Sequence, residues 1–266
     1  MIDDYRKHAV VWDWDGFDNS LEYEYWCKYA MQYGKKVLIP MCALGQVGAY
    51  MAQKGFSVTA FDITKEMIDE GEKRFHSVEN LSLNIADICN LHLSESDFDF
   101  CFIATQDLHL LSDLKMVRKA FQSLSLHLRE GGGLSLELVL PSSESFELPQ
   151  QTFYPRVPNY ADKKVWKESK NRYDAFTKRY YIDQIVYIQD EKGITSFPYS
   201  VVLQYYEQEE IRSDLKDAGF VITGEFQNRN KEPWIVKSQE WIIEAIKNRA
   251  KQASKLSAPA TSEQTI

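Results

Sequence analysis

The chain has 266 residues, of which 44% are hydrophobic and 26% charged, and its net charge is −8 at pH 7. These values are typical of a globular protein with one large domain, or one domain that carries a substantial insertion. We expect no nucleic-acid binding, because the acidic chain has no basic block. We expect no membrane span, because no apolar run reaches about 18 residues.

The cysteines and the N-terminus bear on location and metal binding. The N-terminal segment 1–7 is charged and has no apolar core, so it is not expected to act as a secretory signal. Cys27, Cys42, Cys89 and Cys101 contain no CxxC pair and histidine is sparse, so no metal site is expected. Free cysteines in apolar runs favour a reducing compartment, and we predict a cytoplasmic protein.

Strands and helices alternate over the first part of the chain. Near-continuously apolar strands are expected at 37–40, 58–61, 81–85, 99–104 and 134–140. Helices are expected at 20–33, 45–54, 65–75 and 113–128, with the glycine-rich residues 130–133 as the stop of the last one. This alternation indicates a parallel sheet covered by helices on both faces.

The pattern changes after Pro141. Residues 142–163 are rich in Ser, Pro and Tyr, which predicts a loop. Residues 164–205 contain long runs that alternate aromatic and β-branched residues, so we expect an antiparallel insertion over 142–205. A helix at 207–217 and a strand at 220–226 follow, and the periodicity of 239–247 fits either a strand or a helix. We therefore divide the chain into residues 1–141 with 206–248, the insertion 142–205, and a polar tail 249–266 that is expected to be disordered.

Three successive strand ends have the residues of a nucleotide-type site. In an open parallel sheet, ligands bind outside the carboxyl ends of the strands. The Met41–Gly45 turn leads into a helix whose free N–H groups favour an anionic group. Asp62 can accept both hydroxyls of a ribose, and Asp87 with Ile88 can bind an adenine ring. The alternatives are that the two acids are caps or turn residues and that Gly45 only permits close packing.

These residues resemble the S-adenosylmethionine-dependent methyltransferases with a Rossmann-like fold (class I), over roughly residues 9–247. The resemblance is greatest to the small-molecule group that includes sugar N-methyltransferases and glycine/sarcosine-type enzymes. The stretches that resemble this group are Trp12–Asp15, Glu24–Trp26, Val37–Gly45, Phe61–Ile68, Ala86–Ile88, Leu128–Gly132, Arg172–Arg179 and Leu215–Phe220.

The resemblance implies an α/β fold: a doubly wound, mostly parallel seven-stranded sheet with a final antiparallel strand at 239–247 and the antiparallel insertion between strands 5 and 6. It also implies S-adenosylmethionine as cofactor. The glycine motif is atypical, because Ile39, Met41 and Ala43 stand where the family has an acid and two glycines. The implied cofactor-binding residues are Trp14, Tyr25, Met41, Cys42, Ala43, Gly45, Asp62, Ile63, Met67, Asp87, Ile88, Thr105 and Gln106.

Catalytic candidates lie just past the fourth strand. Methyl transfer needs a general base only if the nucleophile must lose a proton. His109 has an ordinary pKa near neutrality and can serve as that base, or it can be a packing residue. Asp107 is a second candidate and is equally explained as a helix cap. Four aromatic residues of the insertion are candidate substrate contacts or ordinary sheet-face residues: Tyr154, Trp166, Tyr173 and Tyr205.

The function predicted from the sequence is methyl transfer from S-adenosylmethionine to a nitrogen or oxygen of a small molecule. One alternative is a methyltransferase-like binding or regulatory protein without transfer activity, which the missing glycines favour. A weaker alternative is an NAD-type dehydrogenase of the same topology. The expected partner is a small-molecule substrate, and the oligomeric state stays open, with a homodimer as one option.

Overall fold

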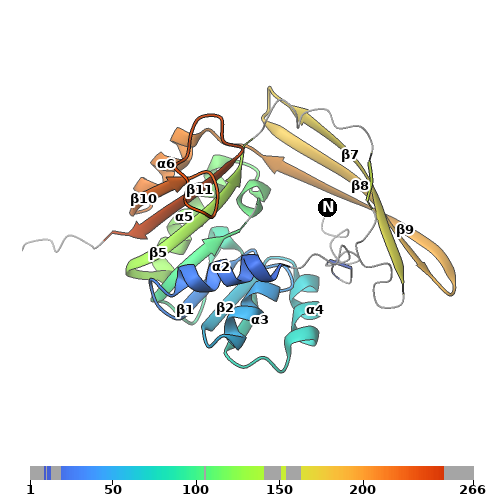
Figure 1. The fold of residues 1–266 in the computed structure, drawn as a ribbon, viewed down its shortest axis with the longest axis horizontal. Coiled ribbons are helices and arrows are strands. Elements are labelled where there is room, and N and C mark those ends of the chain that lie inside the picture. The colour runs from blue at the N-terminus through green and yellow to red at the C-terminus, as the bar shows by residue number, and fades with distance from the viewer. Residues whose placement is uncertain are drawn as a thin grey trace, which may run out of the picture.

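The computed structural model describes residues 9, 11–12, 19–104, 106–140, 151–153 and 163–248 (Figure 1). Its helices are α2 (Ser20–Ala30), α3 (Gln46–Gln53), α4 (Lys65–Phe75), α5 (Leu114–His127) and α6 (Gln208–Asp217), with short 3₁₀ helices η1 (Ile88–Asn90) and η2 (Asp107–Leu110). Its strands are β1 (Lys36–Pro40), β2 (Ser57–Asp62), β3 (Leu81–Ile85), β4 (Phe98–Ile103), β5 (Leu128–Val139), β6 (Gln151–Phe153), β7 (Lys164–Asp174), β8 (Arg179–Asp190), β9 (Gly193–Gln204), β10 (Phe220–Phe226) and β11 (Glu240–Lys247).

Seven strands form the main sheet in the order β10-β11-β5-β4-β1-β2-β3. The five strands from β5 to β3 are parallel, and β11 runs antiparallel to both β5 and β10. The predicted doubly wound sheet with a final antiparallel strand is therefore confirmed. Because β1 pairs with β2 on one side and β4 on the other, the strand order reverses there, which is the usual place for a ligand in such a sheet.

Helices cover the main sheet on both faces, and alternate strand residues enter two separate cores (Figure 1). On one face, Leu38 and Ile103 pack with Phe121 of α5 and Leu215 of α6. On the other face, apolar side chains from the same strands pack with those of α2, α3 and α4. Because both faces of the main sheet are buried, its strands are apolar along nearly their whole length.

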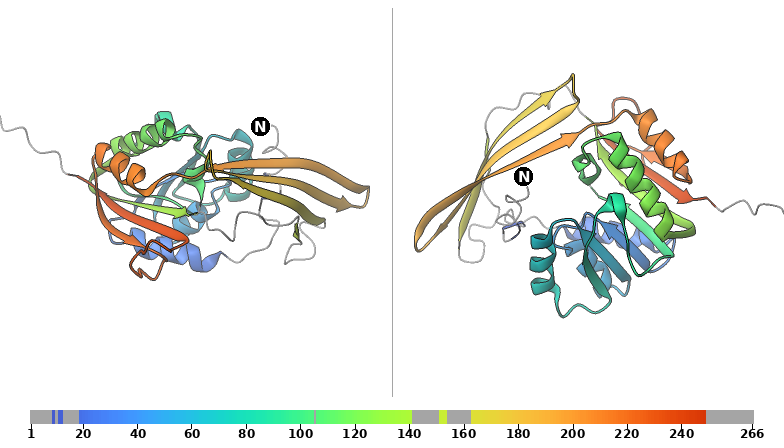
Figure 2. Two further views of the ribbon diagram at one scale, coloured as in Figure 1. Left: turned by 90° about the horizontal axis from the view of Figure 1, so that it is seen from above. Right: turned by 180° about the vertical axis from the view of Figure 1, so that it is seen from behind.

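A second sheet stands apart from the first, with the antiparallel order β6-β7-β8-β9 (Figure 2). This confirms the predicted antiparallel insertion between strands 5 and 6 of the main sheet. The N-terminal part of the chain contacts both units. Val11 packs against Val165 and Val186 of the second sheet. Ala9 packs against Leu44, in the turn after β1. Residues 142–150 and 154–162 of the predicted insertion, and the tail 249–266, lie outside the described residues.

The glycine-rich segment after α5 does not have its predicted role. The helix ends at His127, and residues 130–133 lie inside β5, which begins at Leu128. An added Cβ on Gly133 would lie 2.6 Å from ring atoms of Tyr33, and the register of β4 with β5 shifts between Phe98 and Phe100. Gly133 therefore lets β5 pass beneath the ring of Tyr33, and the glycines of this segment lie within the strand and are not the stop of the helix.

Candidate cofactor site

The turn after β1, residues 41–45, has the left-handed backbone that glycine favours, although Gly45 is the one glycine in it. Met41 and Ala43 have φ values of 54° and 49°, and Gly45 has 82°, so every second residue is in the left-handed region. For a residue with a side chain this conformation costs about 1–2 kcal/mol. The turn is held by the N–H of Cys42, which donates to the carbonyl oxygen of Phe61 at 3.0 Å. Met41 and Ala43 therefore hold a backbone conformation that glycine adopts more readily.

Two glycines in the same region allow close packing. A Cβ on Gly45 would lie 2.7 Å from a methyl group of Leu83, and one on Gly71 in α4 would lie 2.3 Å from the carbonyl oxygen of Leu44. Helix α4 thus lies directly against the turn. This contact keeps the end of β1 and the end of β2 close together.

Asp62 at the end of β2 binds the backbone on both sides. One carboxylate oxygen accepts from the N–H of Ala43 at 3.0 Å, and the other accepts from the N–H of Thr64 at 2.9 Å. Burial raises the pKa of Asp62, and the hydrogen bonds from Thr64 and Ala43 oppose that shift. Each carboxylate oxygen has a second lone pair, so the pair of oxygens can still accept two hydroxyl groups.

The candidate ribose-binding residues after β2 and the candidate adenine-binding residues after β3 differ in solvent exposure. Asp87 accepts from the N–H of Cys89 at 2.8 Å and caps η1, and Ile88 is buried. Ile63 is 68% exposed next to Asp62, whereas Met67 is buried against Ala9 and Leu44. The structure therefore brings Asp62, Ile63 and Asp87 to one edge of the sheet and puts Met67 in the core beneath it.

Asp107 lies in an acidic setting after β4. Loss of hydration raises the pKa of its partly buried carboxyl to about 8, and the carboxylates of Asp62, Glu22 and Glu137 add to the rise. Its neighbour Gln106 is also partly buried, and the predicted residue Thr105 lies outside the described residues. With a pKa of about 8, the carboxyl group of Asp107 loses its proton slightly above neutral pH.

His109 is fixed by the main chain on both sides of its ring. Nδ1 donates to the carbonyl oxygen of Gln204 at 2.9 Å, and Nε2 accepts from the N–H of Val139 at 3.3 Å. Burial lowers the pKa of His109 to about 4. With both nitrogens engaged and the ring neutral, this geometry favours the alternative of a packing residue over that of a general base.

The aromatic candidates lie in three different settings. Tyr205 packs on His109, with ring centres 4.8 Å apart, and Tyr173 meets Tyr205 edge-on at 5.9 Å. Trp166 stacks on Tyr187 at 5.1 Å, on the face of β7 opposite to its neighbour Val165, which faces the N-terminal segment. Tyr173 and Tyr205 therefore lie near the candidate site and Trp166 faces away from it. Trp14 and Tyr154 are outside the described residues.

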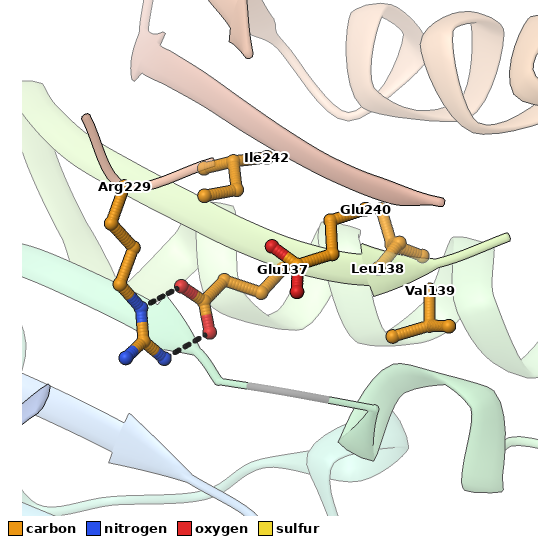
Figure 3. A pocket seen from close by; sticks show the side chains of 6 residues that line it. All are labelled: Glu137, Leu138, Val139, Arg229, Glu240 and Ile242. Carbon is orange, nitrogen blue, oxygen red and sulfur yellow. Dashed lines mark hydrogen bonds and ion pairs between the residues drawn. The ribbon is translucent and has the colours of Figure 1, made fainter. Parts of the chain in front are cut away.

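An ion cluster at the end of β5 was missed by the sequence prediction. Arg229 binds Glu137 through two hydrogen bonds of 2.7 and 2.8 Å (Figure 3). It also lies 3.3 Å from Glu22 of α2. Its guanidinium group also lies 5.5 Å from the ring centre of Tyr25, another predicted site residue. A cavity of about 300 Å³ adjoins the cluster and is lined by Glu137, Leu138, Val139, Arg229, Glu240 and Ile242. An acid in the middle of an otherwise apolar strand was the available signal.

Known proteins to which this chain is similar are methyltransferases. A family model described as a methyltransferase domain matches residues 37–132. The solved S-adenosylmethionine-dependent methyltransferase from Clostridium acetobutylicum ATCC 824 superposes with a TM-score of 0.76 at 18% identity, over 92% of this chain and 99% of that one. Residues 37–132 thus match a methyltransferase domain, and the chain has the fold of a class I S-adenosylmethionine-dependent methyltransferase. S-adenosylmethionine is the cofactor of the methyltransferases that this chain resembles.

Two further relatives are also methyltransferases by name. The putative methyltransferase YqeM of Bacillus subtilis (strain 168) is 23% identical over 152 residues, which are 56% of this chain and 61% of that protein. The chain thus matches about three fifths of the length of this curated relative. The sugar N-methyltransferase KedS8 from Streptoalloteichus sp ATCC 53650 has a TM-score of 0.71 at 15% identity, over 88% of this chain and 90% of that one.

The described residues show neither a metal-binding cluster nor a membrane-spanning helix. Among them, no group of three or more histidine, cysteine, aspartate or glutamate side chains is arranged to hold a metal ion. No helix within the described ranges is long and apolar enough to cross a membrane.

Proposed function

We propose that this chain is an S-adenosylmethionine-dependent methyltransferase that methylates a nitrogen atom of a small-molecule amine, with an oxygen nucleophile as the alternative. The proposal rests on the position and the hydrogen bonds of Asp62. Its carboxylate joins the left-handed turn at Ala43 to the end of β2, where the strand order reverses, and keeps lone pairs for two hydroxyl groups. This is the contact that a ribose needs.

The residues around Asp62 would hold the remaining parts of the cofactor. Asp87 and Ile88 would contact the adenine ring, and the turn at Met41–Gly45 would receive the amino-acid part at the N-terminus of α3. When bound, S-adenosylmethionine supplies an electrophilic methyl group for in-line displacement. The protein's contribution is then orientation, which is worth about 7–11 kcal/mol for well-placed reactants.

The charge near Asp107 favours an amine over an alcohol. Glu22 and Glu137 contribute to the high pKa of Asp107, so the surroundings attract a cation. A carboxyl group with a pKa of about 8 can accept a proton from an ammonium group of similar pKa with little loss of free energy. Tyr173 and Tyr205 nearby can contact a cationic substrate through their ring faces. KedS8, a structural relative, is a sugar N-methyltransferase.

Calorimetric titration with S-adenosylmethionine and S-adenosylhomocysteine tests the first part of this proposal, and we expect both to bind. Mass spectrometry of a panel of amines and alcohols, incubated with protein and cofactor, then tests the second, and we expect amines to gain the mass of one methylene group. No binding of either nucleoside would overturn the proposal. Binding with no transfer to any panel member would favour a methyltransferase-like binding protein. We place the protein in the cytoplasm, where its four unpaired cysteines remain reduced.

A further inference from the structure

The second sheet, which stands apart from the main sheet, has an inner and an outer face (Figure 2). Side chains alternate between the two faces along each strand. Val165 and Val186 belong to the inner face, which packs against Val11 of the N-terminal segment. The outer face consists of the even-numbered residues 164–174 of β7, the odd-numbered residues 179–189 of β8 and the even-numbered residues 194–204 of β9. Two of its isoleucines are exposed to solvent, Ile185 by 42% and Ile194 by 60%.

The outer face combines aromatic rings, exposed aliphatic side chains and charges. Trp166 of β7 stacks on Tyr187 of β8, with ring centres 5.1 Å apart. The guanidinium group of Arg172 lies 3.5 Å from the ring centre of Tyr181. An apolar and aromatic surface that is rimmed by polar residues is typical of a protein interaction site. The outer face therefore has the composition of an interface.

The charges along β7 point to a second copy of this chain as the partner. On the outer face the strand has, in order, Lys164, Trp166, Glu168, Lys170, Arg172 and Asp174. We consider a second copy turned end for end, so that its β7 lies over this one in the opposite direction. Lys164 of one copy then faces Asp174 of the other. Glu168 likewise faces Lys170, and because the copies are equivalent, each pair occurs twice. The charged row is thus complementary to itself.

The remaining pair in this row fits the same arrangement. Trp166 of one copy faces Arg172 of the other, and a guanidinium group over an indole ring is a favourable contact. On β8, the same rotation brings Tyr187 of one copy over Tyr181 of the other, so the two aromatic patches meet. Charges and rings therefore agree on one register.

The geometry of sheet packing allows this register. Sheets that pack face to face keep their strands within about 30° of each other. A two-fold axis across the strands puts β7 over β7, as the charges require. A two-fold axis along the strands would instead put β7 over β9, which has no charged residue, so the lysines and the glutamate would lose water without gaining partners.

The outer face is also large enough for a specific contact. Its three strands have 11 or 12 residues each. At the usual rise and strand spacing they cover roughly 40 by 14 Å, which is about 550 Å² on each copy and about 1,100 Å² in total. A biological interface is expected to bury at least about 1,000 Å². The area therefore fits a dimer at the small end of this range, which dissociates on dilution.

We propose that the outer face of the second sheet joins two copies of this chain in a two-fold dimer, in which β7 of one copy lies antiparallel over β7 of the other. Tyr173, which lies near the candidate site, belongs to the inner face, so the dimer leaves that side of the sheet uncovered. The inference does not depend on the proposed function, because it uses no residue of the cofactor site.

Sedimentation velocity of the full chain, from about 1 μM to about 1 mM, tests this proposal. The wild type should form a dimer as the concentration rises, and salt should weaken it by screening the charge pairs. Glu168→Lys and Lys170→Glu each put like charges opposite one another twice, so each variant alone should dimerise at least about tenfold more weakly. Lys119→Glu, the same change on an exposed residue of α5, is the matched control and should dimerise like the wild type.

An equimolar mixture of Glu168→Lys and Lys170→Glu gives the sharpest result. In the mixed dimer the lysine introduced at position 168 faces the glutamate introduced at position 170, and the native Lys170 faces the native Glu168. Two variants that are monomeric alone should therefore dimerise when mixed. Glu168 accepts a hydrogen bond from the hydroxyl group of Tyr187, so thermal unfolding checks that its variant is folded. If it is not, a mixture of Lys164→Glu and Asp174→Lys makes the same test at the end of the row.

Three results would overturn the inference. The first is a wild type that stays monomeric at every concentration. The second is a dimer that neither single charge reversal weakens, because its interface then lies elsewhere. The third is a mixture of two folded variants that stays monomeric, because the proposed register requires their charges to be complementary.

Discussion

His109 of η2 donates a hydrogen bond from Nδ1 to the carbonyl oxygen of Gln204 at the end of β9. The same ring accepts from the N–H of Val139, the last residue of β5. One side chain thus connects the second sheet to the main sheet, and it does so two residues after Asp107. The position of the second sheet and the position of the catalytic candidate therefore depend on one buried imidazole.

The buried imidazole should make the protein sensitive to acid. The unfolded chain protonates His109 near pH 6.5 and the folded chain only near pH 4, so the unfolded state binds more protons between these values. The stability that neutral His109 contributes is present above pH 6.5 and is lost as the pH falls towards 4, by up to about 3 kcal/mol. Urea unfolding at a series of pH values should show this loss. His109→Gln should be less stable at neutral pH and less acid-sensitive, whereas His76→Gln, at the exposed end of α4, should keep the wild-type slope.

Asp107 should give the opposite pH dependence. The pKa of Asp107 is raised to about 8, so the folded state retains a proton that the unfolded state releases near pH 3.8. Its contribution to stability is therefore greatest below pH 3.8 and is lost as the pH rises through 8. Asp107→Asn, which stays neutral, should be more stable than the wild type by at least about 1 kcal/mol at pH 8. Asp97→Asn, in an exposed loop, is the control; an equal gain there would contradict the explanation.

Most of the fold could be predicted because the strands of the main sheet are buried on both faces. Apolar runs such as 37–40 and 99–104 have no other simple interpretation. The segment 239–247 stayed ambiguous, because its periodicity fits both states, and only its pairing with β5 makes it a strand. The glycines at 131–133 were misassigned because Gly133 packs against Tyr33, which lies about a hundred residues earlier in the chain, and such a contact cannot be read from the local sequence.

Those parts of the site that follow from the order of residues along the chain could be predicted. Those that depend on contacts between distant residues could not. Asp62 ends β2 and Asp87 lies two residues after β3, so their places at the edge of the sheet could be predicted, whereas their roles in cofactor binding stay a prediction. The structural role of His109 needs Gln204, and the Arg229–Glu137 pair joins residues 92 positions apart. The left-handed backbone at Met41 and Ala43 also could not be foreseen, because neither residue type favours it.

The left-handed turn leads to a comparison of three small substitutions. Ala43→Gly removes a side chain from a φ of 49°, so the relief of strain offsets the added freedom of the unfolded chain, and stability should stay equal or rise by up to about 1 kcal/mol. Ala49→Gly, the same change inside α3, should cost about 1 kcal/mol. Gly45→Ala should cost more, because its Cβ would also meet Leu83. Chemical denaturation measures the stability of all three variants. Equal losses of stability in Ala43→Gly and Ala49→Gly would exclude strain at residue 43.

The carboxylate of Asp62 should have separate effects on the fold and on the cofactor. Asp62→Ala removes the acceptor for the N–H groups of Ala43 and Thr64 and the expected acceptor for the ribose hydroxyls. We expect a loss of about 1–3 kcal/mol in stability and at least a tenfold weaker binding of S-adenosylhomocysteine by calorimetry. Asp62→Asn keeps one acceptor oxygen and should recover part of the stability but little of the affinity, because an amide oxygen cannot serve both hydroxyls. Asp69→Ala, which removes an exposed carboxylate paired with Lys65 on the adjoining helix, should leave both quantities nearly unchanged. If Asp62→Ala lost stability and bound the nucleoside as well as the wild type, Asp62 would be a turn residue only, and the ribose would have to bind elsewhere.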